Sequence, residues 1–199
     1  MYQRKDAFYA RAKAAGYRSR AAYKLLQLAQ RQRLFRRGDR VVDLGAWPGG
    51  WLQVAAAEVG PQGTVIGVDL QPIAPLPERQ VTTVVGDITD PGVQQQIAQL
   101  CGGKADVLLS DLAPKLTGVR ARDEAQIDAL AASVLECACR LLRPGGTLVV
   151  KLFVSATTAA YVDRLRQLFR EVRMTRPEAT RKRSAEIYAI ATGFSGAAA

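Results

Sequence analysis

The sequence contains no histidine, and this absence excludes several kinds of chemistry. Serine or cysteine triads with a histidine base cannot form, and most zinc sites, which use histidine ligands, are excluded as well. Any general base must therefore be a lysine, an aspartate, a glutamate, a tyrosine or a cysteine. We expect an activity that needs no metal ion.

The sequence also lacks a hydrophobic run long enough to cross a membrane, and its first residues are polar where a signal peptide would be apolar. The only cysteines are Cys101, Cys137 and Cys139, an odd number whose spacing favours buried thiols. We expect a cytoplasmic protein that makes no membrane contact and acts as a monomer.

Positive charge is concentrated at the two ends of the chain, whose formal net charge is +10. Residues 1–40 hold 12 Lys/Arg and 2 Asp/Glu, residues 41–163 hold 8 and 13, and residues 164–199 hold 8 and 3. Basic ends around a mildly acidic centre indicate a binding surface for a polyanion, with nucleic acid the leading candidate. Solvated helix faces that only aid solubility are the alternative.

Hydrophobic runs alternate with amphipathic segments, which predicts βαβ units and one domain with a substantial core. A basic arm or short helix (residues 1–18) precedes a helix at 20–33 that Ser19 caps, and Pro48 suits the first turn of the next helix. We expect strands at 40–44, 64–69, 81–85, 106–110, 147–153, 171–175 and 186–192, with further helices at 49–59, 91–100, 123–142 and 156–170. The predicted fold is α/β and Rossmann-like, with a mostly parallel seven-stranded sheet, an antiparallel last strand and helices on both faces. The single domain spans residues 1–199, with a basic N-terminal arm and helix at 1–35 and a flexible tail at 195–199.

A Gly/Pro loop follows the first predicted strand, where open α/β sheets bind their ligands. A dinucleotide-binding loop would need a glycine where Trp47 stands, which argues against NAD, and no phosphate-loop motif is present. Three acids, Asp43, Asp69 and Asp87, lie at the ends of three successive strands. This combination resembles the cofactor site of S-adenosylmethionine-dependent methyltransferases, in which Asp69 would bind the ribose hydroxyls and Asp87 the adenine amino group.

Residues 43–51 read Asp-Leu-Gly-Ala-Trp-Pro-Gly-Gly-Trp and resemble the Asp-Leu-Gly-Ala-x-Pro-Gly-Gly-Trp of the FtsJ/RrmJ family of RNA ribose 2′-O-methyltransferases. Residues 19–25, 110–114, 150–153 and 183–188 also match that family, whereas Trp47 replaces its usual small residue. The resemblance implies S-adenosyl-L-methionine as the cofactor. The cofactor-binding residues that it implies are Asp43, Gly45, Gly49, Gly50, Trp51, Asp69, Asp87 and Asp111.

The Lys-Asp-Lys-Glu tetrad of that family falls, in order, on Lys24, Asp111, Lys151 and Glu186. Lys151 lies inside an apolar strand, where an unpaired charge is costly, and Asp111 and Glu186 can supply its partners. A structural ion pair is the alternative. The resemblance implies methyl transfer to a ribose 2′-OH, with Lys151 either the neutral base or a protonated group that orients the 2′-oxygen.

A ribose 2′-OH substrate implies RNA, since DNA lacks this group. Small single-domain members of the family act on a uridine of the 23S rRNA A-loop in the large ribosomal subunit, which is the substrate that we expect. A tRNA, an mRNA cap, or an rRNA-binding assembly role with weak catalysis are the alternatives. The expected RNA contacts are Arg11, Lys13, Arg18, Arg20, Lys115 and residues 181–183, with Tyr9 or Tyr17 available for stacking on a base.

Overall fold

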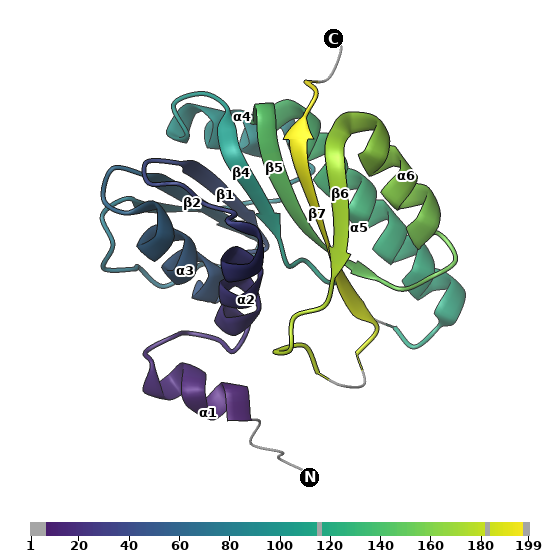
Figure 1. The fold of residues 1–199 in the computed structure, drawn as a ribbon, viewed down its shortest axis with the longest axis horizontal. Helices are drawn as coiled ribbons and strands as arrows, with labels where there is room; N and C mark the ends of the chain where they lie inside the picture. Colours follow the sequence, from purple (N-terminus) through teal and green to yellow (C-terminus); the bar gives the residue numbers. More distant parts are fainter. Residues whose placement is uncertain (1–6, 115–116, 182–183, 197–199) are drawn as a thin grey trace.

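The computed structural model describes residues 7–114, 117–181 and 184–196, so Lys115, Lys182 and Arg183 lie outside the described residues. Its centre is a seven-stranded sheet in the order β3-β2-β1-β4-β5-β7-β6, in which β7 runs antiparallel to both neighbours and the other pairs are parallel (Figure 1). The strands are β1 Arg40–Leu44, β2 Thr64–Asp69, β3 Val81–Val85, β4 Ala105–Ser110, β5 Leu142–Phe153, β6 Phe169–Thr175 and β7 Glu186–Phe194. The predicted fold class is confirmed.

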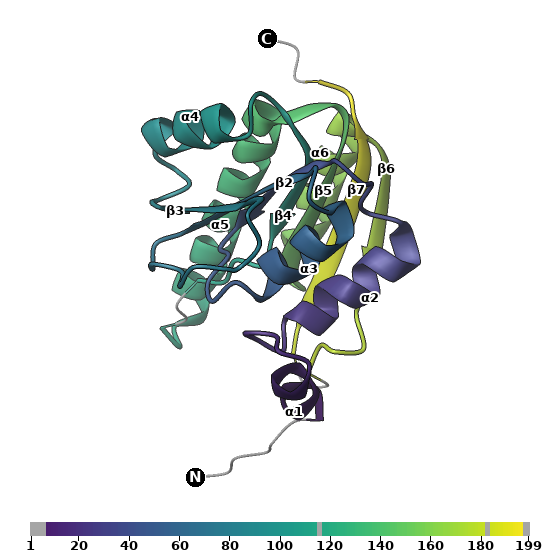
Figure 2. The same cartoon turned by 90° about the vertical axis from the view of Figure 1, so that its left-hand side faces the viewer.

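Helices cover both faces of this sheet (Figure 2). Their bounds are α1 Ala7–Ala14, α2 Ala22–Gln32, α3 Gly50–Val59, α4 Pro91–Leu100, α5 Arg120–Leu141 and α6 Thr158–Leu168. α2 and α3 lie on one face, and α4, α5 and α6 lie on the other. None of the helices in the described part of the chain is long and apolar enough to span a membrane.

Alternation along the strands divides the core into two clusters. In β5, Leu148 and Val150 pack with α5 and α6, whereas Val149 packs with α2 and α3. Successive side chains of a strand point to opposite faces, so Lys151 belongs to the same face as Val149. This places the one lysine of β5 on the face that α2 covers.

Three local predictions at the sequence level were wrong. Ala21, not Ser19, precedes α2 as its N-cap, and no side chain caps the helix, because backbone carbonyls of the turn at Ser19–Ala21 accept from its first N–H groups. Pro48 lies before α3 rather than in its first turn, and the Trp47–Pro48 peptide bond is cis. β5 begins at Leu142, five residues earlier than predicted, because residues 143–146 extend the strand through a register shift opposite β4.

Candidate active site

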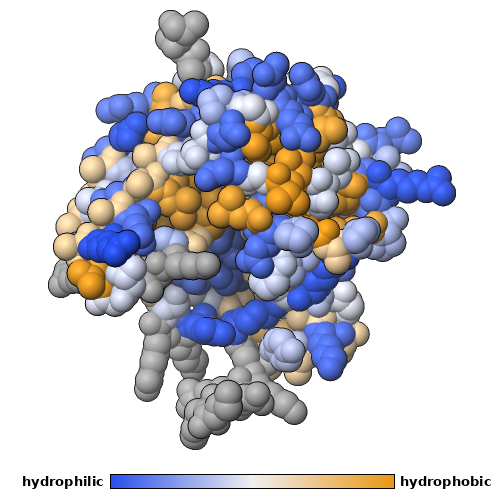
Figure 3. Space-filling view, turned by 180° about the vertical axis from the view of Figure 1, so that it is seen from behind, coloured by the Kyte–Doolittle hydropathy of each residue, from blue (hydrophilic) through white to orange (hydrophobic). Residues whose placement is uncertain are grey.

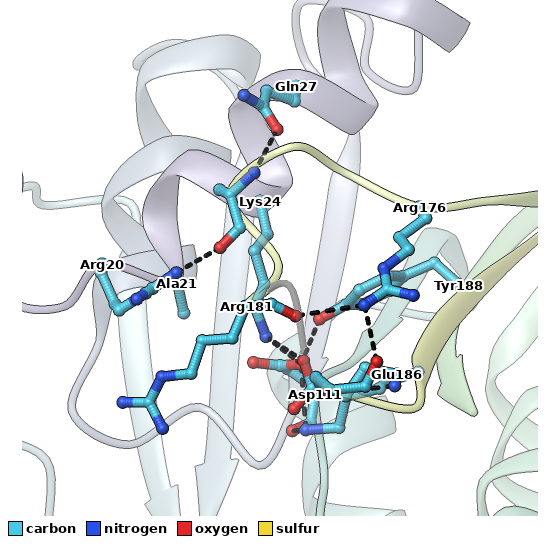
Figure 4. A network of polar contacts seen from close by, with 12 residues as sticks. Arg20, Ala21, Lys24, Gln27, Asp111, Arg176, Arg181, Glu186 and Tyr188 are labelled. Carbon is cyan, nitrogen blue, oxygen red and sulfur yellow. Dashed lines mark hydrogen bonds and ion pairs between the residues drawn. The ribbon is translucent and has the colours of Figure 1, made fainter. Parts of the chain in front are cut away.

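The register of the sheet gathers polar side chains at the carboxyl end of β5. Lys151 pairs directly with Tyr188, and Phe153 pairs with Glu186, across the antiparallel β5–β7 ladder. Residues directly opposite one another share a face, so Lys151, Tyr188 and Glu186 project to the same side. Asp111 follows Ser110, which pairs with Val150, and it therefore emerges beside Lys151. Lys24 reaches the same point from α2 (Figure 4).

Ion pairs join the four tetrad residues in a chain from Lys151 through Asp111 and Lys24 to Glu186. The Lys151 ammonium lies 3.1 Å from Asp111 Oδ1 and donates to the Asp111 backbone carbonyl at 2.6 Å. Lys24 Nζ lies 3.0 Å from Glu186 Oε2 and 3.8 Å from Asp111 Oδ1. Both lysines are 8% exposed, so their charges are balanced by these carboxylates in a site that is largely removed from water.

Tyr188 completes the cluster, and the sequence analysis did not identify it as a site residue. Its hydroxyl donates to Asp111 Oδ1 at 2.6 Å, and its buried ring lies 5.6 Å from Lys24 Nζ. Burial raises the pKa of Tyr188 far above its ordinary value, and the Asp111 charge raises it further, so the phenol keeps its proton and stays a donor. Its spacing of two residues from Glu186 was a signal that it shares the face of the tetrad.

Asp43 is the most unusual carboxylate of the protein. It is 1% exposed, and neither of its side-chain oxygens has a hydrogen-bond partner among the described residues. Burial raises the pKa of Asp43 well above its ordinary value, and the charges of Asp111 and Asp69 add to this effect. A buried carboxylate without donors is costly for the fold, so a positively charged or donor-bearing ligand would find a matching group here.

The other two strand-end acids are held by local backbone groups. Asp69 accepts from the N–H groups of Trp47 and Gln71, both at 2.9 Å. Asp87 is exposed, and both its hydrogen bonds come from Thr89, through the backbone N–H and the hydroxyl. These bonds lower the pKa of Asp87. The ends of β1, β2 and β3 therefore present three carboxylates at one edge of the sheet.

The loop between β1 and α3 is packed closely against other segments. Gly45 has φ +79°, and a Cβ there would lie 2.4 Å from the side chain of Leu112. The close approach of the loop after β4 therefore requires a glycine at position 45. Gly49 has φ +106°, and a Cβ there would lie 3.1 Å from the Arg18 guanidinium, whereas Gly50 begins α3. Trp47 is 52% exposed, which shows that this unusual residue does not fill a gap in the core.

Trp51 lies in the core at 3% exposure. Its indole N–H donates to the Ala21 carbonyl at 2.8 Å, and its ring lies 6.1 Å from the Tyr188 ring. The tryptophan therefore ties α3 to the start of α2 and supports the tyrosine that holds Asp111. Its observed contacts are structural.

Several residues predicted to contact RNA have partners within the protein. The Arg18 guanidinium donates to the carbonyls of Pro48, Ala74 and Pro75, so it fastens the N-terminal segment to the β1–α3 loop and to the loop between β2 and β3. Tyr17 packs edge-on against Tyr23, and the Arg11 guanidinium lies 5.1 Å from the ring of Tyr23. The Arg20 guanidinium donates to the Ala179 carbonyl.

Other predicted RNA contacts face the solvent. Lys13, Arg181 and Tyr9 are exposed, with Tyr9 at 56%. Among the described residues, no group of three or more possible ligands is arranged to hold a metal ion. Cys101 and Cys137 are buried, as predicted, and Cys139 is half-buried. Burial raises the pKa of Cys137 to about 11, which makes it an unreactive thiol.

Comparisons with known proteins identify the family of this chain. The family model of the FtsJ-like methyltransferases matches residues 17–194. A ribosomal RNA large subunit methyltransferase E of Methanoculleus marisnigri is 48% identical over 192 residues, which cover 96% of this chain and 93% of that protein. A protein of the same name from Anaeromyxobacter is 41% identical over 198 residues, covering 100% of this chain and 72% of its own length.

Two solved structures share the fold. A Plasmodium falciparum protein assigned as a ribosomal RNA methyltransferase has a TM-score of 0.79 and 28% identity, covering 90% of this chain and all of that one. A fibrillarin of Aeropyrum pernix, solved with bound S-adenosyl-L-methionine, has a TM-score of 0.61 and 19% identity over 86% of this chain and 76% of its own. The second likeness shows the fold alone. Taken with the family match over 17–194, these relatives show that the chain belongs to the FtsJ-like methyltransferase family.

Proposed function

We propose that this protein transfers a methyl group from S-adenosyl-L-methionine to a ribose 2′-OH of ribosomal RNA, at a uridine of the 23S rRNA A-loop in the large subunit. The observation that carries the proposal is the contact of two buried lysines with Asp111, at 3.1 Å from Lys151 and 3.8 Å from Lys24. The names of the large-subunit methyltransferase relatives support the ribosomal substrate. A tRNA or an mRNA cap has no comparable support.

We assign to Lys151 the contact with the reacting ribose hydroxyl. Two of the directions around its Nζ are used by Asp111, through the backbone carbonyl and Oδ1. A neutral amine with both N–H groups so engaged would turn its lone pair toward the substrate, whereas an ammonium would turn its third N–H there. In either protonation state Lys151 Nζ faces the substrate hydroxyl in the same direction, and it either deprotonates this hydroxyl or orients its oxygen.

The other three side chains position Lys151. Asp111 Oδ1 receives the Tyr188 hydroxyl at 2.6 Å as well as Lys151, so the carboxylate is held from two sides. Glu186 pairs with Lys24 at 3.0 Å and keeps that lysine beside the carboxylate. Lys24 also adds positive charge where negative charge develops on the substrate oxygen. We therefore assign the largest roles to Lys151 and Asp111, with Lys24 next and Glu186 last.

The residues at the ends of β1, β2 and β3 fit the proposed cofactor. The carboxylate of Asp43, which has no hydrogen-bond partner in the described part of the chain, suits a group with positive charge and N–H donors, and both are present on the methionine part of S-adenosylmethionine. Asp69 and Asp87 would hold the ribose and the adenine, and the loop of Gly45, Gly49 and Gly50 would lie beside them, with Trp51 supporting the loop from the core. Asp111 would link the cofactor to the tetrad. When bound, the cofactor would supply the methyl group of its sulfonium to the 2′-oxygen, and the sulfur would leave as a neutral thioether.

We also propose that the RNA lies across the tetrad and is held by exposed cations of the N-terminal and C-terminal segments. Lys13 on α1 and Arg181 before β7 are exposed and lie on the two basic segments of the chain. Phosphate contacts of this kind predict binding that weakens with salt. The protein would act as a cytoplasmic monomer in which residues 1–199 form one methyltransferase domain, with the arm and helix of residues 1–35 and the tail of 195–199 as its ends.

Methyl transfer to ribosomal particles tests this function directly. Large subunits from a strain that lacks its own enzyme are incubated with the protein and labelled S-adenosylmethionine, and the modified ribose is then mapped. We expect label at one uridine of the A-loop with the wild-type protein and none with Lys151→Met that still binds the cofactor. Label in tRNA but not in subunits would overturn the substrate assignment, and absence of label from all RNA would leave only a binding role.

A further inference from the structure

A cavity of about 210 Å³ opens between the first halves of α5 and α6, beyond the carboxyl end of β5. Ile127 and Ala131 of α5 form one wall, Ala160 and Tyr161 of α6 form the other, and Phe153 lies at the end of β5 between them. The face that carries these helices shows exposed hydrophobic side chains among charged ones (Figure 3). None of the proposed cofactor or tetrad residues lines this cavity.

A second hollow, of about 20 Å³, adjoins the cavity. It is lined by Ser110, Pro114 and Lys151, and it shares Phe153 and Ile127 with the larger one. Lys151 Nζ lies 5.7 Å from the centroid of the ring of Phe153, the last residue of β5. The Lys151 side chain projects to the α2 face, so a base attached to a ribose at Lys151 would reach the space between α5 and α6 by passing around the end of β5 at Phe153.

The chemistry of the cavity suits a planar ring with polar edges. Its volume is below the roughly 300–1,000 Å³ of pockets that take drug-sized ligands, so it has room for one small ring system. Phe153 and Tyr161 offer aromatic faces, on which RNA-binding proteins stack bases that leave the helix. Asp128, Thr157 and Arg164 also line the cavity, and the Thr157 hydroxyl donates to Asp128 Oδ1 at 2.6 Å.

Tyr161 lines this cavity, and its hydroxyl oxygen is buried with no hydrogen-bond partner among the described residues. Burial raises the pKa of Tyr161 above its ordinary value, so the hydroxyl keeps its proton. Because protein atoms enclose this oxygen, it would donate to a carbonyl oxygen of a ligand ring only after the side chain turns toward the cavity.

We propose that the cavity between α5 and α6 binds the base of the nucleotide that is methylated, turned out of its stack. This inference rests on the proposed function, because it needs a ribose at Lys151. It assigns recognition of the target base to a surface outside the tetrad and the cofactor loop. The enzyme would then select its nucleotide by the fit of the base and not only by its position in the RNA.

Ala160→Leu tests the proposal, because it adds a side chain to the cavity wall at an exposed position of α6 that accepts leucine readily. Ala159→Leu, also exposed on α6 but not lining the cavity, is the matched control. Both variants and the wild type are assayed on an RNA that carries the mapped site and on the same RNA with only the target base removed. Ala131→Leu fills the cavity from α5 as a second variant.

On intact RNA we expect kcat/KM of Ala160→Leu to fall about tenfold, because stacking of one base contributes about that much, whereas Ala159→Leu stays near wild type. On abasic RNA the kcat/KM of the wild type should fall to the level of Ala160→Leu. Removal of the base should lower the kcat/KM of the variant little further, so the effects of the substitution and of the missing base are not additive. Unchanged cofactor affinity and thermal stability show that the fold is intact.

Two results would overturn the base pocket while leaving the methyltransferase function in place. In the first, the losses of kcat/KM from Ala160→Leu and from removal of the base multiply; in the second, both cavity-filling variants keep full activity on intact RNA. Failure of the wild type to methylate any RNA would instead overturn the function, and the pocket assignment with it. The two failures are distinguished by the wild-type reaction on intact RNA alone.

Discussion

Removal of the Tyr188 hydroxyl tests whether this buried residue holds the catalytic carboxylate in place. Tyr188→Phe keeps the ring, which is fully buried and packs 6.1 Å from Trp51, and deletes only the hydrogen bond of 2.6 Å to Asp111 Oδ1. Asp111 keeps Lys151 at 3.1 Å, so its charge does not become unpaired. The fold should therefore survive, while the carboxylate gains freedom to move.

The size of the effect follows from that single bond. A hydrogen bond to a charged acceptor contributes about 1.5–3 kcal/mol, and part of this is recovered by the remaining partners of Asp111, so we expect a stability loss of about 1–2 kcal/mol. For a domain of this length, that corresponds to a decrease in Tm of roughly 2–8 °C. If alignment of Lys151 depends on the bond, kcat should fall about tenfold or more, with little change in cofactor affinity.

The pH dependence gives an independent check. The pKa of Tyr188 is raised in the folded state, so its stabilising contribution is fully present below the ordinary tyrosine value of about 10 and is lost as the pH rises further. The stability advantage of the wild type over Tyr188→Phe should thus be constant from pH 7 to 9 and shrink above about pH 10. Thermal unfolding across this range, with methylation kinetics at neutral pH, measures both effects. Wild-type kcat in Tyr188→Phe, or an advantage that grows above pH 10, would refute the reasoning.

Four further predictions follow from the site. Asp43→Asn should weaken cofactor binding, which calorimetric titration measures. Its stability relative to wild type should rise between pH 5 and 8, because the raised pKa of Asp43 means that ionisation of this carboxyl destabilises the fold. Thermal unfolding tests this, and a stability difference that does not change with pH would contradict it. Arg18→Met should weaken cofactor binding about tenfold by freeing the loops that the guanidinium joins, and unchanged affinity would show that the loops hold themselves. Glu186→Gln should cost less than about tenfold in kcat, since the glutamine oxygen still accepts from Lys24, and a loss as large as that of Lys151→Met would require a direct catalytic role. Lys13→Ala should weaken RNA binding about equally for all sequences and reduce the slope of log affinity against log salt by about one, and an unchanged slope would place this lysine off the RNA path.

The layout of the fold was predictable because it depends on local pattern. Strands β1, β2 and β3 and helix α4 have the predicted bounds, since buried parallel strands read as apolar runs and turn residues mark their ends. The errors lie where tertiary contacts override local preference. Ser19 lost its predicted capping role to a backbone turn, and β5 begins before its two glycines, where the Arg143 side chain donates to Asp106 on the neighbouring strand.

The residues of the candidate site were more predictable from the sequence than the contacts between them. Lys151 was identifiable because a charge inside an apolar strand requires partners, and Asp43 because it ends the strand before the glycine loop. Tyr188 was missed because an aromatic residue in a strand is ordinary, and only the pairing of β7 with β5 places its hydroxyl on Asp111. Arg18 was expected to face RNA, but whether an arginine binds a phosphate or three carbonyls depends on which loops lie next to it.

By itself, the sequence determined the order of strands and helices along the chain, the absence of histidine chemistry and the basic ends, because composition and periodicity act over short distances along the chain. The identity of the four tetrad residues came from the resemblance of their motifs to those of the FtsJ/RrmJ family. The tertiary structure alone decided the geometry. It placed Lys24 of α2 beside Glu186 of β7, left Asp43 buried without a donor from the residues that the structure describes, and opened the cavity between α5 and α6. These features arise between segments that are distant in the chain, and only the packing of helices on a sheet of fixed register brings such segments together.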